Sequence, residues 1–551
     1  MSLPSGNRAL VAQPLRPPWD VPRSAASAVP EHRMARWLPA WALAAVGALV
    51  WLVAAPLTPD LAAHEYRAAV FRRVGLSVWE QGWYGGHALP GYSVLMPPLA
   101  ALLSPQFAAV LAAVIAAWCF QRLADGHWAA GAAKAAGICF AIGVVSVLVG
   151  GQLTFATALA PALGALLAAR CGHLWLAGAL GAATTLTSPV AAAFLVLACV
   201  AWWLGARGRG SIIVATATIA PGVLIVLAFP EGGAQPFGTS AFTAALAVAL
   251  GLFAVLHREE RVLRTSAVLY SAALILGFEL ATPLGGNLVR LAAVFGLPLA
   301  AGALWGRHRG LLVLLVLPLL YAQWLEPLRS LQRDSGDPSA ASGYHAPLLA
   351  ELDRRAATEG PFRTEIPFTA DHWETRYISL THPLARGWER QLDTKLNPLF
   401  YDGTPLTPAR YVSWLHNLAV RYVALPDVRL DRAGLAEGRL LAGGRVPGLR
   451  QVWHSAHWRL FRVDHATGLA SPPVRVTAIG LDTINLTTPS AATATVRVRF
   501  TPYWVLARGH GCVAPTRDGW TSVRLTAGGP ARLAIRFALD RVRATSPRCT
   551  A

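Results

Sequence analysis

The chain contains many apolar stretches that are long enough to cross a lipid bilayer. A hydrocarbon core about 30 Å thick needs about 20 such residues per helix. The first stretch runs from Trp37 to Leu57, and the others occupy residues 94–121, 128–149, 153–169, 174–204, 212–229, 240–256, 266–282, 288–305 and 310–325. Hydrophobic residues make up 54% of the chain and charged residues only 14%, against about 25% charged in a typical soluble domain. We therefore predict a polytopic α-helical membrane protein, and exclude a soluble or disordered chain.

Arginine decides how the ambiguous segment 174–204 crosses. The short connections rich in arginine contain Arg122, Arg170, Arg207, Arg209, Arg258, Arg261, Arg264, Arg307 and Arg309. If segment 174–204 crosses twice, or turns as a hairpin at Pro189, all these connections fall on the same side as the N-terminus. Because positive loops stay in the cytoplasm, this arrangement is favoured. It predicts about 11 spans in the plasma (inner) membrane, with a cytoplasmic N-terminus and an extracytoplasmic C-terminal part.

The net charge of +19 does not indicate nucleic acid, because much of it sits in these orienting loops. Only Lys134 and Lys395 are lysines. This preference for arginine is typical of GC-rich coding and suggests an actinobacterial or similar source.

The chain changes character after the last apolar stretch. We predict a disordered cytoplasmic tail over residues 1–36, a transmembrane domain over 37–326, an extracytoplasmic α+β domain over 327–468 and a β-sandwich over 469–551. Helix-like patterns cover 345–358 and 408–419, short strands cover 421–425 and 458–463, and residues 494–500 alternate with period two.

Only two of the six cysteines lie in the soluble part, Cys512 and Cys549. We predict that they form a disulfide, because disulfides persist in oxidising compartments outside the cytoplasm. Two free thiols are the alternative. The other four cysteines lie in or beside apolar spans, where they act as packing residues.

Acidic residues are scarce in the membrane-spanning half of the chain, and several of them lie in the first outer loop, residues 58–93. A helix starting at Asp60 would place Asp60, His64 and Arg67 on one face and would use Asp60 as its N-cap. Asp60 with His64 and Glu65 could then act as a base and its partner, or hold a divalent cation such as Mg²⁺ or Mn²⁺. The alternative is a capped amphipathic helix in the membrane interface, with Phe71, Val74 and Trp79 facing lipid.

Further polar groups fall on the same side of the predicted topology. The loop continues with Trp83, Tyr84, His87 and Tyr92, which could form a platform for a sugar or a lipid phosphate, or only an interfacial anchor belt. Gln152, Glu279, Asn287 and Arg290 begin or end spans on that side. Arg290 could bind a phosphate, or could instead pair with Glu279 inside the membrane.

The order of these motifs resembles the C-type glycosyltransferase superfamily of membrane enzymes. More narrowly, it is similar to bacterial membrane proteins described as 6-pyruvoyl-tetrahydropterin synthase-related. The resemblance rests on Asp60 and His64 after the first span, Gly151-Gln152, Thr187-Ser188-Pro189, the run from Pro283 to Arg290, and Arg386-Gly387-Trp388-Glu389-Arg390-Gln391. Two departures stand out. Asp60 is followed by Leu61 where relatives often carry a second acid, and Ser188-Pro189 replaces a His-Pro pair.

The resemblance implies an extracytoplasmic glycosyltransferase with a polyprenyl-phosphate-linked sugar as donor. Asp60 would be the base, Arg290 would hold the donor phosphate, and the acceptor would be an envelope glycan or glycoprotein. The partners are then membrane lipids, donor and acceptor, with no nucleic acid. The alternative is a non-catalytic membrane protein, either an envelope-assembly factor or a transporter. No glycine-rich nucleotide loop stands in the sequence, which agrees with a lipid-linked donor.

Overall fold

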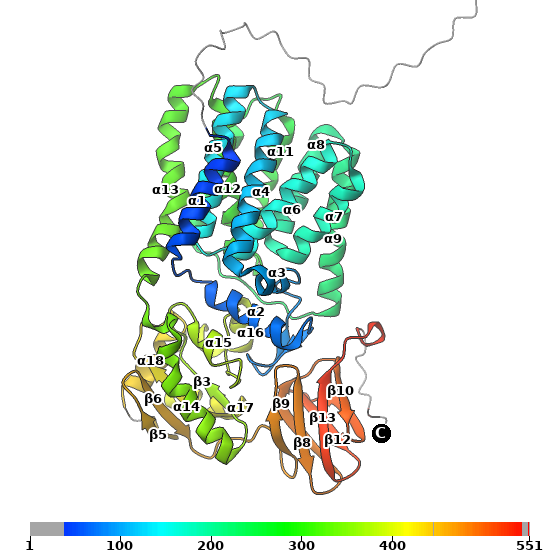
Figure 1. Cartoon of the computed structure of the whole chain (residues 1–551), viewed down its shortest axis with the longest axis vertical. Helices are drawn as coiled ribbons and strands as arrows, with labels where there is room; N and C mark the ends of the chain where they lie inside the picture. Colours follow the sequence, from blue (N-terminus) through cyan, green and yellow to red (C-terminus); the bar gives the residue numbers. More distant parts are fainter. Residues whose placement is uncertain (1–37, 445, 543–548, 550–551) are drawn as a thin grey trace, which may run out of the picture.

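The computed structural model describes residues 38–444, 446–542 and 549. The tail predicted over residues 1–36 lies outside the described residues. A bundle of long helices forms one half of the molecule, and two units containing β-sheets form the other (Figure 1). This is the predicted architecture, a polytopic helical membrane protein with a soluble part.

Eleven apolar helices build the bundle within the described residues. Eight are long and apolar enough to cross a membrane by length and composition, and α1, α7 and α10 are shorter, which gives 8 + 3 = 11. The helices are α1 (Ala40–Ala54), α4 (Pro105–Asp125), α5 (Ala130–Val149), α6 (Leu153–Arg170), α7 (Leu174–Thr187), α8 (Pro189–Ala206), α9 (Arg209–Ala228), α10 (Thr239–Val255), α11 (Arg261–Glu279), α12 (Val289–Leu304) and α13 (Arg309–Asp334). The predicted polytopic helical architecture is therefore confirmed, with eight candidate spans and three shorter apolar helices among the described residues.

The segment 174–204 turns back on itself, as the arginine pattern predicted. Helix α7 ends at Thr187 and α8 begins at Pro189, with the Ser188 hydroxyl accepting a hydrogen bond from the backbone N–H of Ala191 at 3.5 Å. Proline favours the first turn of a helix because it has no N–H to satisfy. Helix α7 has 14 residues, or about 21 Å at 1.5 Å per residue, so each arm of this hairpin is short.

The arginine-rich connections gather at one end of the bundle. The Arg170 guanidinium donates to the backbone oxygens of Leu123 at 3.0 Å and Gly126 at 2.9 Å. The Trp128 indole donates to Glu260 at 3.0 Å, which joins the α4–α5 and α10–α11 connections. The sheet-containing units lie at the opposite end (Figure 1). The predicted grouping of these loops on one side is therefore confirmed.

Two predicted span limits are wrong. The stretch 94–121 contains two helices, because α3 (Met96–Leu103) ends at Ser104 and the spanning helix α4 begins only at Pro105. Ser104 adopts a left-handed φ of 73° and caps α4 through its hydroxyl, 3.2 Å from the N–H of Phe107, so the two helices cannot be continuous. At the other end of the domain, α13 continues through Pro327 to Asp334.

The α+β unit is a four-stranded sheet flanked by helices. Its strand order is β3 (Arg363–Glu365), β4 (Val420–Pro426), β6 (Trp458–Val463) and β5 (Leu449–His454), with β3 parallel to β4 and the other pairs antiparallel. The helices are α14 (Ser342–Glu359), α15 (Trp373–Tyr377), α16 (Arg390–Leu396), α17 (Pro408–Asn417) and α18 (Leu435–Ala442). The helices and strands predicted from the sequence here are confirmed.

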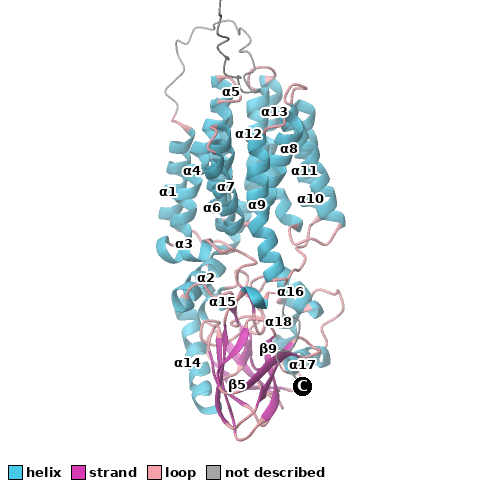
Figure 2. Ribbon diagram, turned by 90° about the vertical axis from the view of Figure 1, so that its right-hand side faces the viewer, coloured by secondary structure: helices cyan, strands magenta, loops and turns pink. Residues whose placement is uncertain are grey.

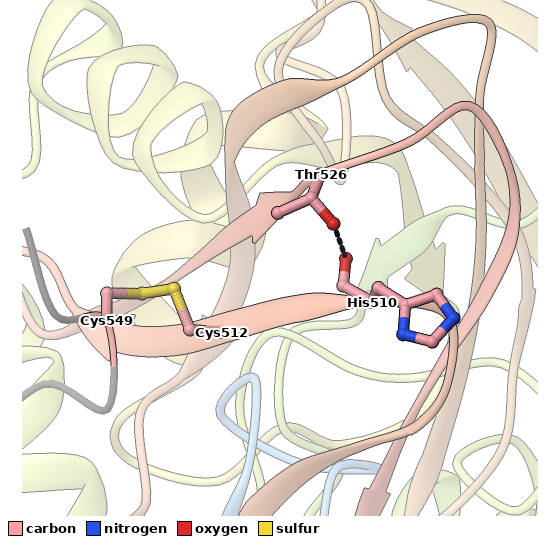
Figure 3. Close-up of a disulfide and its surroundings, with 4 residues drawn as sticks. All are labelled: His510, Cys512, Thr526 and Cys549. Atoms are coloured by element: carbon pink, nitrogen blue, oxygen red, sulfur yellow. Dashed lines mark hydrogen bonds between the residues drawn. A yellow bond between two sulfur atoms is a disulfide. The ribbon is translucent and has the colours of Figure 1, made fainter.

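The C-terminal unit is the predicted β-sandwich. One sheet has the order β10 (Trp504–Arg508), β13 (Gly529–Ile535), β8 (Thr483–Thr488) and β7 (Arg475–Ile479), and the other has β11 (Gly511–Pro515), β12 (Trp520–Leu525) and β9 (Ala492–Arg499). The two sheets share one core, which includes Val496, Val498 and Leu533. The predicted disulfide joins Cys512 of β11 to Cys549 (Figure 3).

The first outer loop lies where the three units meet. Helix α2 (Leu61–Val74) and the two-stranded sheet of β1 (Trp79–Glu80) and β2 (His87–Ala88) follow α1, and Figure 2 shows α2 and α15 between the bundle and the strands. Trp79 is only 5% exposed and belongs to the sandwich core. Trp79 therefore does not face lipid, and eight residues of α2 are buried within the protein.

Candidate active site at the membrane boundary

Asp60 presents a carboxylate that no described residue binds. It stands at the N-cap position of α2, but its side chain makes no capping hydrogen bond. The residue is half-buried, and no hydrogen bond or ion pair to its carboxylate occurs among the described residues. Burial raises the pKa of Asp60 to about 6, while the charges of Arg290 and His372 oppose this shift. Asp60 therefore holds the predicted N-cap position without the predicted capping hydrogen bond, and its carboxylate remains available to a ligand.

Arg290 is the positively charged residue that interacts most strongly with Asp60, and it too forms no ion pair among the described residues. It lies in the first turn of α12, and directly before it the 3₁₀ turn η1 (Gly285–Leu288) carries Asn287. The guanidinium interacts electrostatically with Asp60 and Tyr92 and lies 5.5 Å from the ring of Phe155. Within the described part of the chain it has no ion pair within 4.0 Å, with Asp60 or with Glu279. A carboxylate and a guanidinium thus interact electrostatically without forming an ion pair.

His64 and Tyr92 lie beside Asp60. The Nδ1 of His64 lies 3.4 Å from the Thr154 hydroxyl oxygen, and its ring centroid lies 6.4 Å from that of Tyr92. Burial, and then the charge of Arg67, lower the pKa of His64 to about 3, so the imidazole is neutral. Burial and the neighbouring Asp60 raise the pKa of Tyr92 to about 12, so the phenol keeps its proton. Both side chains are therefore neutral hydrogen-bonding groups beside Asp60.

Gln152 stands at the entrance to α6, beside the Asp60 loop. A Cβ added at Gly151, which has a φ of +73°, would lie 2.8 Å from Thr58 and 3.2 Å from Pro59. The connection therefore packs directly on the residues that precede Asp60, and only glycine allows that approach. This packing places Gln152 at the same end of the bundle as Asp60, half-buried at the N-cap of α6.

The residues predicted to hold a divalent cation do not fit one. Glu65 points to the α+β unit and forms an ion pair with Arg376 at 3.3 Å. No group of three His, Cys, Asp or Glu side chains suited to a metal ion occurs in the described residues. Asp60 and His64 therefore lack a third protein ligand, whereas Mg²⁺ and Mn²⁺ take several oxygen ligands. The positive charge next to Asp60 is supplied by Arg290 instead.

Trp83, Tyr84 and His87 are fully buried, so they form neither a sugar platform nor an anchor belt here. Trp83 stacks between Tyr66, at 4.3 Å between centroids, and His87, at 5.4 Å. The Tyr84 hydroxyl donates to the backbone oxygen of Gly387 at 2.5 Å. Tyr84 and Gly85 adopt left-handed φ angles of 59° and 74°, which turn the chain sharply into the interior. Sequence reasoning could not separate exposed from buried aromatic residues at this boundary.

Behind them lies a cluster of paired charges. The Nδ1 of His87 lies 3.0 Å from Glu80, and its Nε2 lies 3.6 Å from Glu389. Glu80 also accepts hydrogen bonds from Tyr66 at 2.7 Å and from the N–H of Gly82 at 2.6 Å. Burial opposes the charged imidazole, but Glu80 and Glu389 outweigh it and raise the pKa of His87. We call Glu80, His87 and Glu389 the buried charge cluster.

Arg67 joins the buried charge cluster to the space around Asp60. Its guanidinium pairs with Glu389 and lies 3.9 Å from the centre of the Tyr92 ring. Trp388 packs edge-on against Tyr92, with 5.4 Å between ring centroids. Trp388 and Glu389 come from the Arg386–Gln391 motif, which the sequence singled out by resemblance only. The site is therefore completed from a unit more than 300 residues away in the chain.

Sequence reasoning missed His372 and misplaced Glu279. His372 is buried, adopts a left-handed φ of 58° at the start of α15, and interacts electrostatically with Asp60. Strained backbone of this kind concentrates at functional sites, but no motif marks it in the sequence. Glu279 is exposed at the end of α11 and lies outside the group. The structure thus brings Asp60, His64, Tyr92 and Arg290 together, with Gln152 and Asn287 at the edges.

The fold and site define a multi-pass membrane protein with its polar site at the end of the helix bundle that meets the soluble units. Similar solved structures are those of arabinofuranosyltransferase AftD from Mycobacteria, with a TM-score of 0.47 and 14% identity over 91% of this chain and 57% of that chain. A mutant of that enzyme gives 0.46 and 14% over 91% and 60%. The chain thus spans less than two thirds of their length, and at these TM-scores the likeness decides nothing about function. No family model and no curated protein matches the chain.

Proposed function

We propose that this protein is a glycosyltransferase that transfers a sugar from a polyprenyl-phosphate donor to a cell-envelope glycan or glycoprotein. One observation carries the proposal. Asp60 and Arg290 are oppositely charged, half-buried, close enough to interact, and unpaired within the described residues. Leaving two such charges without hydrogen-bonding partners is costly unless a ligand supplies them. A ligand with a hydroxyl to deprotonate and a phosphate to bind satisfies both.

The residues divide the reaction between them. The Asp60 carboxylate accepts the proton of the acceptor hydroxyl as its oxygen bonds to the anomeric carbon of the donor sugar. The bond from that carbon to the phosphate oxygen breaks, and the phosphate leaves with the electron pair. The Arg290 guanidinium, with its planar fork of donors, stabilises the negative charge that develops there. A pKa of about 6 leaves Asp60 ionised at neutral pH yet basic enough to take a proton.

The orientation belongs to the same proposal. The end that carries the arginine-rich connections faces the cytoplasm, because positive loops are retained there. The site and both soluble units then face outward, which agrees with the Cys512–Cys549 disulfide. Nucleotide-linked sugars belong to the cytoplasm, so a lipid-linked donor suits this side. Clustering of the polar groups at one end rather than at mid-membrane argues against a transporter.

An apolar groove on the bundle suits the lipid part of such a donor. Its cavity of about 760 Å³ lies between α5 and α13 and is lined by Ile142, Leu317, Pro318, Leu320, Tyr321 and Trp324. The end of α5 meets α13 near Gln152, since a Cβ at Gly150 would lie 3.6 Å from Pro327 and 3.7 Å from the Gln152 amide. A hydrocarbon chain in the groove would therefore lead toward the site.

The test is transfer by the purified full chain in lipid nanodiscs. We expect sugar from one member of a panel of radiolabelled polyprenyl-phosphate sugars to enter an envelope acceptor fraction, and a deletion strain to accumulate that lipid-linked sugar. Asp60→Asn should abolish both transfer and complementation. Glu279→Gln removes an exposed acid at the same end of the bundle and should leave them unchanged. If Asp60→Asn complements as well as the wild type, the enzyme assignment fails and a non-catalytic role replaces it.

A further inference from the structure

A second positively charged site lies on the α+β unit, away from Asp60. Arg421 of β4, Arg462 of β6 and Arg450 of β5 line a cavity of about 690 Å³ together with Glu359, Val463, Asp464, His465 and Ala466. The three arginines come from three strands that are neighbours in the sheet order β3-β4-β6-β5. The cavity therefore lies at one end of the sheet, where β4 and β5 begin and β6 and α14 end.

The strand register places two of these arginines directly opposite each other. Arg450 is the antiparallel partner of Arg462. Like charges facing each other across a strand pair destabilise a sheet unless an anion lies between or beside them. Because the pairing register of β5 and β6 fixes this opposition, it is a built feature of the sheet and not a chance approach of flexible side chains.

The protein supplies too little negative charge to balance the site. Glu359 is shared among Arg421 at 3.6 Å, Arg462 at 3.6 Å and Arg355 at 4.0 Å, and it also accepts a hydrogen bond from Tyr422 at 2.5 Å. Asp464 lines the cavity but lies within 4.0 Å of no arginine in the described residues. Arg450 is exposed and has no ion pair among those residues. One guanidinium thus stays open at the mouth of the cavity.

We propose that this cavity binds an anionic group, a carboxylate or a phosphate, carried by the acceptor polysaccharide. Arginine forks match both groups bidentately, and a cavity of this size accommodates a small number of sugar rings. Strands β5 and β6 lie in the half of the molecule opposite the helix bundle (Figure 1), so the ligand arrives from the aqueous phase and not from the surrounding bilayer. The acceptor role rests on the proposed transferase function, whereas binding of the anion does not.

The experiment measures binding directly, without transfer. The full chain in phosphatidylcholine nanodiscs is titrated with a fluorescent oligogalacturonate, a neutral malto-oligosaccharide of equal length, and a polyglutamate of equal charge. We expect the oligogalacturonate to bind, with an affinity that falls as salt rises, and the malto-oligosaccharide not to bind. Arg450→Gln and Arg462→Gln should each weaken binding about tenfold. Arg475→Gln, which removes an exposed arginine from β7 of the sandwich, should leave binding unchanged.

The outcomes separate the two proposals. Asp60→Asn should lose transfer and keep oligogalacturonate binding. Equal affinities in the wild type and the Arg450→Gln/Arg462→Gln double variant would overturn the site, as would the lack of binding to any anion. Tighter binding of polyglutamate would assign the cavity to an acidic protein partner instead. Oligogalacturonate binding in a chain that transfers no sugar from any donor would overturn the acceptor role alone.

Discussion

The charged residues on the two sides of Arg67 differ in whether other side chains of the protein pair with them. On one side, Glu80 and His87 are completely buried and form an ion pair at 3.0 Å, with further hydrogen bonds to Glu80 from Tyr66 and Gly82. On the other side, Asp60 and Arg290 are half-buried and make no such pair within the described residues. Paired charges in an interior stabilise the contact between parts of a fold, whereas half-buried unpaired charges are available to bind a ligand. The contrast assigns a structural role to Glu80 and His87 and a role in the reaction to Asp60 and Arg290.

Asp60→Asn should give the largest effect on activity. The amide keeps the size of the side chain but cannot accept the acceptor proton, so transfer should fall by about 10²- to 10⁴-fold. Because Asp60 makes no capping bond and burial disfavours its charge, the melting temperature should not fall below that of the wild type. Transfer assays and thermal unfolding in parallel check this, and a variant that loses both together would place Asp60 with the supporting residues.

Glu80→Gln should have the opposite effect, because it should lower the stability of the fold and leave the transfer reaction unchanged. Removing Glu80 leaves the His87 charge with only Glu389, at 3.6 Å, which also pairs with Arg67. Loss of a buried partner of this kind costs about 3–5 kcal/mol. We expect a lower melting temperature and less folded protein, with normal transfer per folded molecule. Activity measured against the folded fraction gives the answer. Full stability with lost transfer would instead move Glu80 into the reaction.

Arg290→Met should lower transfer by about 10²- to 10³-fold, because a donor aimed at developing negative charge is lost. Arg290→Lys keeps a point charge but not the bidentate fork, so its loss should be smaller, about tenfold. Donor titration resolves the cause, since both variants should also bind the polyprenyl-phosphate donor less tightly. If Met and Lys behave alike, the charge of Arg290 has no part in binding phosphate.

Transfer should depend on pH through Asp60. The base works only when ionised, so activity should rise with pH through a midpoint of about 6 and fall about tenfold for each pH unit below it. Stability follows the reverse trend. The folded state holds the proton more tightly than the unfolded state, so the contribution of Asp60 to the free energy of unfolding decreases as pH rises from about 4 to about 6. Asp60→Asn should remove this part of the pH dependence of unfolding, which titration of both proteins checks.

Glu65→Gln should have the smallest effect. Glu65 pairs with Arg376 at the edge of α2, and both side chains remain partly exposed, at 32% and 26%. Pairs of this kind contribute about 0–1 kcal/mol, so transfer and melting temperature should change little. A loss approaching that of Asp60→Asn would restore Glu65 as a working member of the site.

Part of the site was predictable because it depends on position along the chain. Asp60 follows the first span and Arg290 opens a later one, so topology alone puts them at the same membrane face. His372, Trp388 and Glu389 reach that face only because the α+β unit packs on α2. Nothing in their local sequence requires this contact. The burial of Trp83 and Tyr84 was likewise beyond the sequence, since aromatic and glycine residues occur both in exposed membrane interfaces and in covered turns.

Local features of the chain were enough to predict the apolar helices, the hairpin at Pro189, the grouping of the arginine-rich loops, the sandwich and the partners of the disulfide. These depend on local apolar length, charge and periodicity, which survive without any long-range contact. The packing of the three units settled which charges were paired. It turned Glu65 away from Asp60, enclosed His87 with Glu80, and left Asp60 and Arg290 open. Those outcomes depend on how three units pack around one loop, and the desolvation and pairing of a charge follow from that packing rather than from its neighbours in the chain.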